Sequence, residues 1–226
     1  MPNDETRELE TIEVETGAKP AGSIIWMHGL GADGHDFEPI VPELVAPNER
    51  ALRFVFPNAP VRPVTINNGY AMRAWYDIVG IDRHSAQDET AIRGSDAIVR
   101  ALIERENSRG IPTERIVLAG FSQGGAMALF SGTRYPEKLA GIMALSCYML
   151  MAKTFAAERS MANQSTPVFL AHGLQDPVVH PQLGEDTRGL LEQAGYSVEW
   201  RPYQMPHSVC PEEIVDIAKW LRQVLP

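Results

Sequence analysis

The chain has 226 residues, of which 44% are hydrophobic and 22% are charged, the proportions of an ordinary soluble globular protein. This length suits one domain, so we predict a single domain over residues 1–226, with residues 1–10 as a flexible N-terminal segment. Acidic residues outnumber basic residues by 29 to 20, and the formal net charge is −9. This charge argues against nucleic acid or an anionic lipid surface as a standing partner.

The N-terminal residues and the cysteines bear on the compartment. Residues 1–5 are polar and acidic apart from Met and Pro, so we expect no secretory signal. No apolar stretch reaches the length of a membrane-spanning helix, so we expect no stable membrane association. Cys147 and Cys210 are far apart in sequence and form no CxxC pair, which predicts neither a metal site nor a disulfide framework. We predict a cytoplasmic protein that is a monomer or a homodimer.

Strand and helix patterns alternate along the chain, which is typical of a mostly parallel sheet with helices on both faces. The predicted strands number about seven, the first of them at an edge, and lie near residues 11–16, 23–28, 52–56, 115–120, 139–146, 167–172 and 197–203. Two helices show clear apolar stripes. The stripes comprise Ile92, Ser95, Ile98 or Val99, and Leu102 or Ile103 in one helix, and Ile214, Ile217, Trp220 or Leu221, and Val224 in the other.

One interval, from Pro57 to about Ala86, follows neither the strand nor the helix pattern. It is rich in proline, asparagine and glycine, and it contains Tyr70, Trp75 and Tyr76. A stretch of this length without secondary structure is usually functional or forms a short cap. We therefore predict a minimal, cap-like loop region over residues 57–86.

Residues 120–124 read Gly-Phe-Ser-Gln-Gly and follow the predicted strand directly. The serine of Gly-x-Ser-x-Gly between a strand and a helix sits on a sharp turn and exposes its hydroxyl above the sheet. We expect backbone strain at Ser122 and no room for side chains at Gly120 and Gly124, where the turn folds back on itself. The helix start behind Ser122 supplies N–H groups and partial positive charge, which favour an oxyanion. The pattern predicts a nucleophilic serine.

A nucleophilic serine needs a base that is held by a third group. After a serine on a strand-to-helix turn of this kind, an acidic residue is expected next in the chain, followed by a histidine. Asp176 follows the predicted strand at 167–172, and His207 follows the predicted strand at 197–203. Because open α/β sheets place their sites at the carboxyl ends of the strands, these side chains should converge. We predict that Ser122, Asp176 and His207 form a catalytic triad.

Asp176 and His207 also have ordinary structural interpretations. Asp176 precedes a proline and is compatible with a plain turn. His207 is compatible with a loop histidine that packs against Trp200 or Tyr203. The joint occurrence of acid and histidine in this order, after a Gly-x-Ser-x-Gly motif in its strand-turn-helix context, favours the triad over both alternatives.

The remaining histidines and the two cysteines fit a catalytic role less well. His28 and His172 end predicted strands but precede or crowd the acid, so we interpret them as structural residues or as supports of the site. Cys147 and Cys210 do not lie on a strand-to-helix turn. We interpret both thiols as bystanders to the chemistry.

Acyl transfer also requires hydrogen-bond donors at the place where the carbonyl oxygen gains charge. The backbone N–H of Gln123, directly after the nucleophile, is predicted to be one donor. The second is expected from a loop after an earlier strand, and the glycine-rich residues 28–31 form such a loop. We predict that the loop presents the N–H of Leu30, with a tight turn of no function as the alternative.

Five segments together resemble the phospholipase/carboxylesterase family, which contains bacterial carboxylesterases and acyl-protein thioesterases. They are residues 28–31, 73–78, 120–126, 172–176 and 207–210, and the resemblance runs from about Ile24 to Leu225. The resemblance implies a single-domain α/β-hydrolase that cleaves esters or thioesters with Ser122, Asp176 and His207. It also implies oxyanion donors at Leu30 and Gln123. A mechanism of this type requires no metal or organic cofactor.

Substrate preference is weakly encoded in the sequence. Four residues next to the proposed chemistry are predicted to line an apolar acyl groove, with ordinary packing as the alternative: Leu30, Met72, Trp75 and Val178. Such a groove suits small-molecule or lipid-like substrates, above all short- to medium-chain acyl esters. The family resemblance adds long-chain thioesters and lysophospholipids, and the residues do not choose among these classes.

Other functions on the same fold are also compatible with parts of the pattern. Dienelactone-type hydrolases favour cysteine in place of Ser122, and peptidases usually carry an additional domain, so both are disfavoured. A non-catalytic α/β-hydrolase-fold binding module is the main alternative. Such modules commonly lack a triad residue, whereas all three residues are present here. We therefore predict a serine carboxylic-ester hydrolase.

Overall fold

The computed structural model describes residues 10–46, 49–81 and 85–226. Within them, seven strands form one sheet in the order β1-β3-β2-β6-β7-β8-β9, and two further strands form a hairpin. The sheet strands are β1 Thr11–Glu15, β2 Ser23–Met27, β3 Arg53–Pro57, β6 Ile116–Phe121, β7 Gly141–Leu145, β8 Val168–Gly173 and β9 Val198–Tyr203. The predicted flexible segment at residues 1–10 lies outside the described residues, apart from Glu10.

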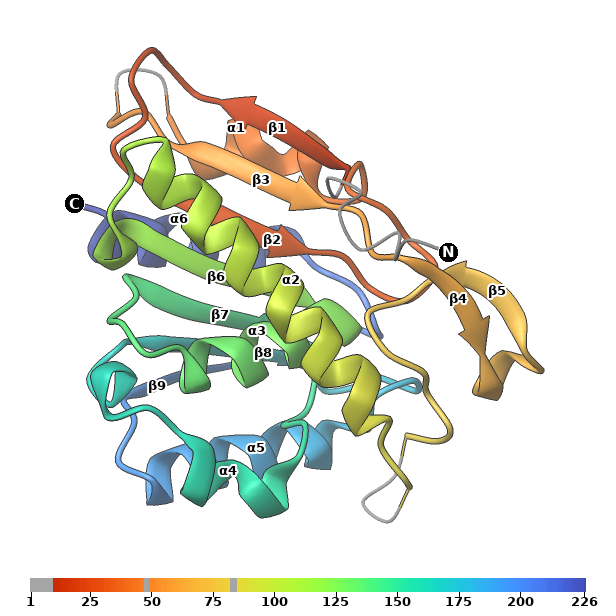
Figure 1. Ribbon diagram of the computed structural model, residues 1–226. Helices are drawn as coiled ribbons and strands as arrows, with labels where there is room; N and C mark the ends of the chain where they lie inside the picture. Colours follow the sequence, from red (N-terminus) through yellow and green to blue (C-terminus); the bar gives the residue numbers. More distant parts are fainter. Residues whose placement is uncertain (1–9, 47–48, 82–84) are drawn as a thin grey trace.

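The sheet is parallel except at one edge, as Figure 1 shows. There β1 runs antiparallel to β3, with Thr11 opposite Pro57. All seven predicted strands are confirmed, and their ends differ from the observed ends by at most two residues. The carboxyl ends of six parallel strands therefore meet at one edge, where the predicted functional residues also lie.

Helices cover both faces of the sheet (Figure 1). They are α1 Val41–Leu44, α2 Glu89–Ser108, α3 Gln123–Arg134, α4 Ala152–Glu158, α5 Pro181–Gln193 and α6 Pro211–Val224. Short 3-10 turns occupy Glu38–Ile40, Thr65–Asn67, Thr113–Arg115 and Met161–Asn163. In β2 the side chains alternate: Ile25 and Met27 join the core under α2 to α5, whereas Ile24 and Trp26 join the core under α1 and α6.

Among the α-helices, α2 and α5 each begin after a residue whose side chain caps the first turn. At the start of α2, the side chain of Asp88 accepts a hydrogen bond from the N–H of Ala91. At the start of α5, the side chain of His180 accepts one from the N–H of Gln182, and α6 opens with Pro211. The predicted stripes are confirmed, since the apolar faces of α2 and α6 are buried in the two cores.

The predicted cap-like interval contains more secondary structure than its sequence indicates. Apart from residues 82–84, which are outside the described residues, it holds a hairpin of β4 Val61–Val64 and β5 Tyr70–Arg73. This hairpin projects from the carboxyl edge of the sheet (Figure 1). The strands are four residues long and half of their residues are exposed, so neither an apolar run nor strict alternation marks them in the sequence.

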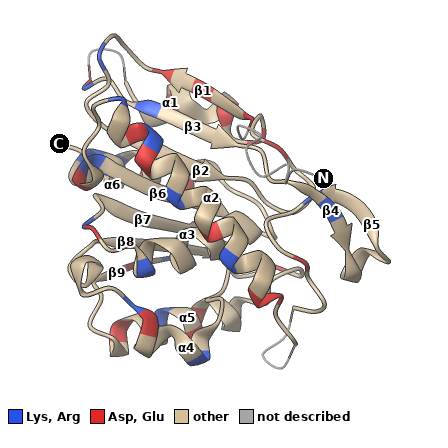
Figure 2. Ribbon diagram, viewed as in Figure 1, with Lys and Arg blue, Asp and Glu red and all other residues tan. Residues whose placement is uncertain are grey.

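Basic and acidic residues are mixed along the helices in the view of Figure 2. Figure 2 shows Lys and Arg interspersed with Asp and Glu along α2 and α5, while the central strands are mostly uncharged. In the part of the chain that the structure describes, no helix is long and apolar enough to cross a membrane.

Candidate active site

Ser122 lies on a sharp turn between β6 and α3. Its backbone has φ 53° and ψ −118°, a conformation that residues other than glycine rarely adopt. The strain predicted from the motif is therefore present. A Cβ atom on Gly120 would lie 2.2 Å from the carbonyl carbon of Gly124, and a Cβ atom on Gly124 would lie 2.1 Å from the carbonyl oxygen of Met27. Glycine at these two positions is what lets the turn close against β2.

The structure brings Ser122, His207 and Asp176 together in one hydrogen-bonded series. The Nε2 atom of His207 lies 2.9 Å from the hydroxyl oxygen of Ser122, and its Nδ1 atom lies 2.6 Å from Oδ2 of Asp176. Because the Asp176 carboxylate accepts from Nδ1–H, Nε2 is left free to accept the serine proton. The imidazole packs against the ring of Phe121 at a centroid distance of 4.7 Å.

The Asp176 carboxylate is fixed on both oxygens. Oδ1 accepts hydrogen bonds from the backbone N–H groups of Val178, at 2.8 Å, and Val179, at 2.9 Å. Oδ2 faces His207, and the side chain is fully buried. Three donors therefore hold the carboxylate in one orientation, which in turn fixes the orientation and tautomer of the imidazole.

Backbone hydrogen bonds tie the loop of the acid to the loop of the histidine. The N–H of Leu174 donates to the carbonyl of Tyr203 at 2.8 Å, and the N–H of Gln175 donates to that of Met205 at 3.1 Å. Gly173 permits this approach, since a Cβ atom there would lie 2.4 Å from the carbonyl oxygen of Met205. The two loops therefore form one unit, and the spacing of acid and histidine follows from it.

His172 supports the acid from beneath, in agreement with the predicted supporting role. Its Nε2 atom donates to the carbonyl of Val179 at 2.8 Å and lies 3.5 Å from Oδ2 of Asp176. Burial lowers the pKa of His172. The residue is therefore neutral near pH 7 and does not compete as a charged partner for the carboxylate.

Neither thiol has the environment of a nucleophile. Cys147 is fully buried, and burial raises the pKa of its thiol well above the ordinary value. Burial also raises the pKa of the Cys210 thiol. A thiol acts as a nucleophile in its thiolate form, so both cysteines are poorly suited to that role at neutral pH.

The two predicted oxyanion donors belong to two segments that lie next to Ser122, the start of α3 and the loop after β2. Gln123 is the first residue of α3, where backbone N–H groups lack a partner within the helix. Leu30 is half-buried in the loop that follows β2. This loop passes close to Ser122, because a Cβ atom built on Gly29 would lie 3.5 Å from Cβ of Ser122. The loop is also tied to the hairpin by the N–H of Gly31, which donates to the carbonyl of Arg73 at 2.9 Å.

The structure corrects the predicted place of Trp75, which does not line a groove. The residue is fully buried, and its indole N–H donates to the carbonyl of His28 at 3.0 Å. Its backbone N–H donates to the side-chain oxygen of Gln123, whose amide nitrogen donates to the carbonyl of Tyr76. The side-chain role of Gln123 was missed, although a buried amide at a helix start is a signal for such contacts.

The other predicted groove residues lie at the surface near the site. Met72 is half-buried on β5. Its sulfur lies near the loop that follows β2, 3.5 Å from the position that a Cβ atom on Gly31 would take. Val178 is 49% exposed beside Asp176, to which its N–H donates. Met72 therefore borders the loop that contains Leu30, and Val178 borders Asp176.

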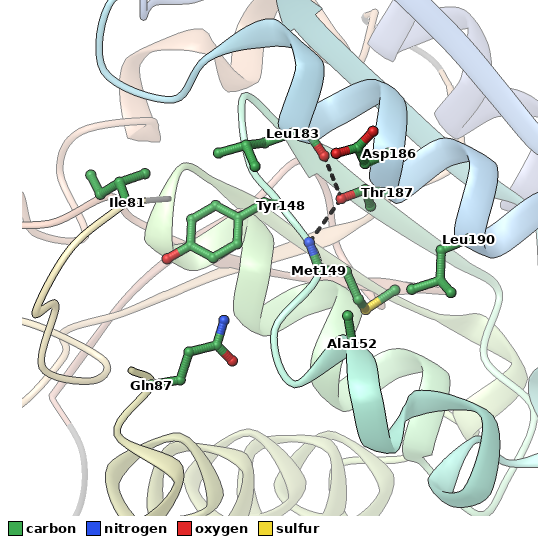
Figure 3. Close-up of a pocket in the computed structure, with 9 residues that line it drawn as sticks. All are labelled: Ile81, Gln87, Tyr148, Met149, Ala152, Leu183, Asp186, Thr187 and Leu190. Carbon is green, nitrogen blue, oxygen red and sulfur yellow. Dashed lines mark hydrogen bonds between the residues drawn. The ribbon is translucent and has the colours of Figure 1, made fainter. Parts of the chain in front are cut away.

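A cavity of about 250 Å³ opens near the same edge of the sheet (Figure 3). It lies between the segment before α2, the segment after β7, and α5. Its walls are Ile81, Gln87, Tyr148, Met149, Ala152, Leu183, Asp186, Thr187 and Leu190. Thr187 fastens two of the walls, because its hydroxyl accepts from the N–H of Met149 and donates to the carbonyl of Leu183, each at 2.8 Å. Sequence reasoning missed this cavity, since its residues come from three separate segments.

Among the described residues, no cluster of three or more His, Cys, Asp and Glu side chains is placed to hold a metal ion.

Known proteins of similar sequence and structure cover almost the whole chain. The sequence profile of the phospholipase/carboxylesterase family matches residues 9–225. Acyl-protein thioesterase 1 of Neurospora crassa is 43% identical over 219 residues, which cover 92% of this chain and 89% of that protein.

Two crystal structures show the same fold. Acyl-protein thioesterase 2 of Zea mays superposes with a TM-score of 0.86 at 28% identity, covering 97% of this chain and 100% of that one. SOBER1 of Arabidopsis thaliana superposes with a TM-score of 0.85 at 31% identity, covering 91% of this chain and 99% of that one. The predicted α/β-hydrolase fold is confirmed. The chain belongs to the phospholipase/carboxylesterase family.

Proposed function

We propose that this serine hydrolase cleaves short- to medium-chain acyl esters through an acyl-enzyme, with Ser122, His207 and Asp176 as its catalytic triad. The observation that carries the proposal is the unbroken hydrogen-bonded series from hydroxyl to imidazole to carboxylate, at 2.9 and 2.6 Å. Similarity to acyl-protein thioesterases supports acyl thioesters as further substrates. Lysophospholipids are a third candidate class.

In the first step, Ser122 attacks the acyl carbon. As the Ser122 oxygen forms the new bond, Nε2 of His207 takes the hydroxyl proton. The electron pair of the carbonyl double bond moves onto the carbonyl oxygen of the substrate. The backbone N–H groups of Leu30 and Gln123 donate to that oxyanion. The removal of one such donor typically costs about a hundredfold to a thousandfold in rate. Asp176 stabilises the imidazolium that forms.

In the second step, the intermediate collapses and the enzyme is acylated. The carbonyl re-forms, the bond to the alcohol or thiol breaks, and the leaving group takes the proton from His207. Water then attacks the acyl-enzyme with His207 again as the base, and Ser122 recovers its proton when the carboxylic acid leaves. Every proton is moved by a protein side chain or by water, so the reaction needs no cofactor.

We further propose that the acyl chain extends from Ser122 toward the cavity next to α5. Its walls are mostly apolar, and they begin within a few residues of the site. Tyr148 is three residues from Leu145, whose carbonyl accepts the N–H of Ser122 at 2.8 Å. Leu30, Met72 and Val178 would then border the ester itself. In this arrangement the apolar acyl group would be buried in the cavity and removed from water, which favours binding.

Charge and composition also bear on the partners and the compartment. We propose that the protein works in the cytoplasm, as a monomer or a homodimer, without nucleic acid as a partner and without stable membrane association. The supporting observations are the net charge of −9 and the mixture of basic and acidic residues along the helices in Figure 2.

Hydrolysis assays test the proposed function. Wild type and Ser122→Ala are compared on nitrophenyl esters of increasing chain length and on an acyl thioester. We expect measurable wild-type turnover, and a loss of at least about a thousandfold in kcat in the variant, which loses the nucleophile. The circular dichroism and the melting temperature should be those of a folded protein. Equal turnover of the two proteins, or no turnover of any ester by wild type, would contradict the proposal.

A further inference from the structure

The two proposed oxyanion donors belong to segments that are distant in sequence. Leu30 lies in the loop after β2, and Gln123 opens α3, so the spacing of their N–H groups depends on tertiary contacts. A displacement of about 1 Å in such a site can lower the rate about a hundredfold. Residues that fix this spacing would therefore control the rate without touching the substrate.

Trp75 contacts both segments at once. Its indole N–H donates to the carbonyl of His28 at 3.0 Å, and its ring packs on the His28 ring at a centroid distance of 5.5 Å. On the other side, its backbone N–H donates to the side-chain oxygen of Gln123 at 2.7 Å. The hydroxyl of Ser95, on α2, donates to the carbonyl of Trp75 and so anchors this link to the core. A fully buried residue thus joins the two segments that carry the donors.

The contacts of His28 define its tautomer. Its Nε2 atom accepts the backbone N–H of Ala59 at 3.0 Å, so Nε2 carries no proton. Its Nδ1 atom, 2.6 Å from the carbonyl oxygen of Gly29, must then carry the proton and donate. Burial lowers the pKa of His28, which agrees with a neutral ring at pH 7.

This tautomer aims the N–H of Leu30. The carbonyl of Gly29 and the N–H of Leu30 belong to the same planar peptide group, and in a trans peptide the two bonds point in opposite directions. When Nδ1–H of His28 holds the carbonyl on one side, the N–H is turned to the other side. The hydrogen bond also polarises the peptide group, which strengthens its N–H as a donor.

We propose that Trp75 and His28 are positioning residues that hold the N–H groups of Leu30 and Gln123 at the spacing the oxyanion requires, an inference that rests on the proposed function. Neither side chain needs to touch the substrate. His28 orients one donor, and Trp75 fixes the segment of that donor against the segment of the other. Ordinary packing of two buried rings is the interpretation that the experiment must exclude.

The test compares two tryptophan-to-phenylalanine variants. Trp75→Phe keeps an aromatic ring and loses the indole donor to His28. Trp26→Phe is the matched control, because Trp26 is equally buried and its indole nitrogen has no hydrogen-bond partner among the described residues. The readouts are kcat and KM for a nitrophenyl ester, the inhibition constant of a trifluoromethyl ketone, and the melting temperature. The ketone is informative because Ser122 adds to its carbonyl and leaves an oxyanion in the site.

We expect Trp75→Phe to lower kcat by about 10- to 100-fold and to raise the inhibition constant of the ketone by a similar factor, with KM nearly unchanged. The reason is that the oxyanion exists in the transition state and in the ketone adduct, but not in the bound ester. Trp26→Phe should stay within a few-fold of wild type in all three constants. Equal effects of the two variants, or a change confined to KM, would overturn the inference while leaving the proposed function intact.

A second measurement uses the wild-type protein and needs no activity. In nitrogen-15 NMR at pH 7, the ring signals of His28 should show a protonated Nδ1 and an unprotonated Nε2. A proton on Nε2, or a doubly protonated ring, would overturn the inference even if Trp75→Phe were slow. If wild-type turnover were instead absent, the proposed function would fail on the hydrolysis assay, and this spectrum would still decide the orientation of the Leu30 peptide.

Discussion

Ser122 holds a strained backbone conformation at the turn between β6 and α3. A strained φ/ψ pair of this kind costs on the order of 1–3 kcal/mol. The compensation is visible in its own backbone, where the N–H donates to the carbonyl of Leu145 at 2.8 Å and the carbonyl accepts from Ala126 at 3.0 Å. The first hydrogen bond joins the turn at Ser122 to β7, and the second belongs to the first turn of α3. The hydroxyl is thereby held at the edge of the sheet where His207 arrives.

Asp176→Asn gives a sharp test of the acid at this scale. An amide can still accept the N–H groups of Val178 and Val179, but its nitrogen would face Nδ1 of His207 and favour the wrong imidazole tautomer. We expect kcat to fall by about 10³- to 10⁴-fold while the fold is kept. Steady-state kinetics together with the melting temperature check this. A variant with more than a tenth of the wild-type kcat would show that the carboxylate has no such role.

The sequence predicted the three residues of this series because each carries a local signal. Ser122 is marked by glycines two residues away on either side, and Asp176 and His207 by the strands that precede them. Trp75 has no such signal. An aromatic residue in an interval without periodicity is compatible with a substrate groove and with the core, and only tertiary contacts decide between them.

The junction of β6, α3 and β2 is the element on which the site depends. At its centre, α3 begins against the end of β2 so closely that a Cβ atom on Gly124 would lie 2.1 Å from the Met27 carbonyl oxygen and 2.6 Å from that of His28. This contact places the N–H of Gln123 beside the loop of Leu30. Helix and strand meet here through backbone atoms, which cannot shift aside as a flexible side chain can.

Two glycine-to-alanine variants of helices distinguish this contact from ordinary helix propensity. Gly124→Ala should lower the free energy of unfolding by about 3 kcal/mol or more, because the methyl group overlaps backbone atoms. Gly94→Ala in α2 is the control, since a Cβ atom there meets nothing within 4 Å, and it should raise stability by about 0.5–1 kcal/mol. Chemical denaturation measures both. A neutral Gly124→Ala would mean that α3 does not pack on β2 as described.

Predictability at the element scale follows the length and burial of each segment. The central strands are five or six residues long and buried on both faces, so they appear as continuous apolar runs. The hairpin has Pro63 within β4, and its end residues Val61 and Tyr70 are 64% and 70% exposed. Such strands are held by their mutual pairing, which no local pattern in the sequence encodes.

At the scale of the whole molecule, buried titratable groups contribute to the dependence of stability on pH. Burial raises the pKa of Glu213, at the start of α6, to about 8. The native state therefore binds this proton more tightly than the unfolded state, whose value is near 4.5. Stability from this group is complete below pH 4.5 and is lost as the pH rises through about 8. The lowered pKa values of His28 and His172 act in the opposite direction, below about pH 6.5.

Glu213→Gln isolates this contribution. Between about pH 6.5 and 8, we expect the wild-type free energy of unfolding to fall as the pH rises, by up to about 1.4 kcal/mol per pH unit. The variant carries a neutral amide and should show little slope there. Glu212→Gln is the control, because Glu212 is exposed on the same turn. Urea titrations at several pH values give these slopes. Parallel slopes in wild type and Glu213→Gln would show that Glu213 is ionised in the native protein.

A fluorophosphonate probe tests the assignment of Ser122 as the nucleophile most directly. Such a probe forms a covalent bond to a serine oxygen only when a base removes the serine proton. A non-catalytic binding module would therefore leave the probe unreacted. Mass mapping of the labelled wild-type protein at neutral pH should find one phosphonyl group, on the peptide that contains Ser122, and His207→Ala should label far more slowly. An unlabelled but folded wild-type protein, or a label on another residue, would contradict the account.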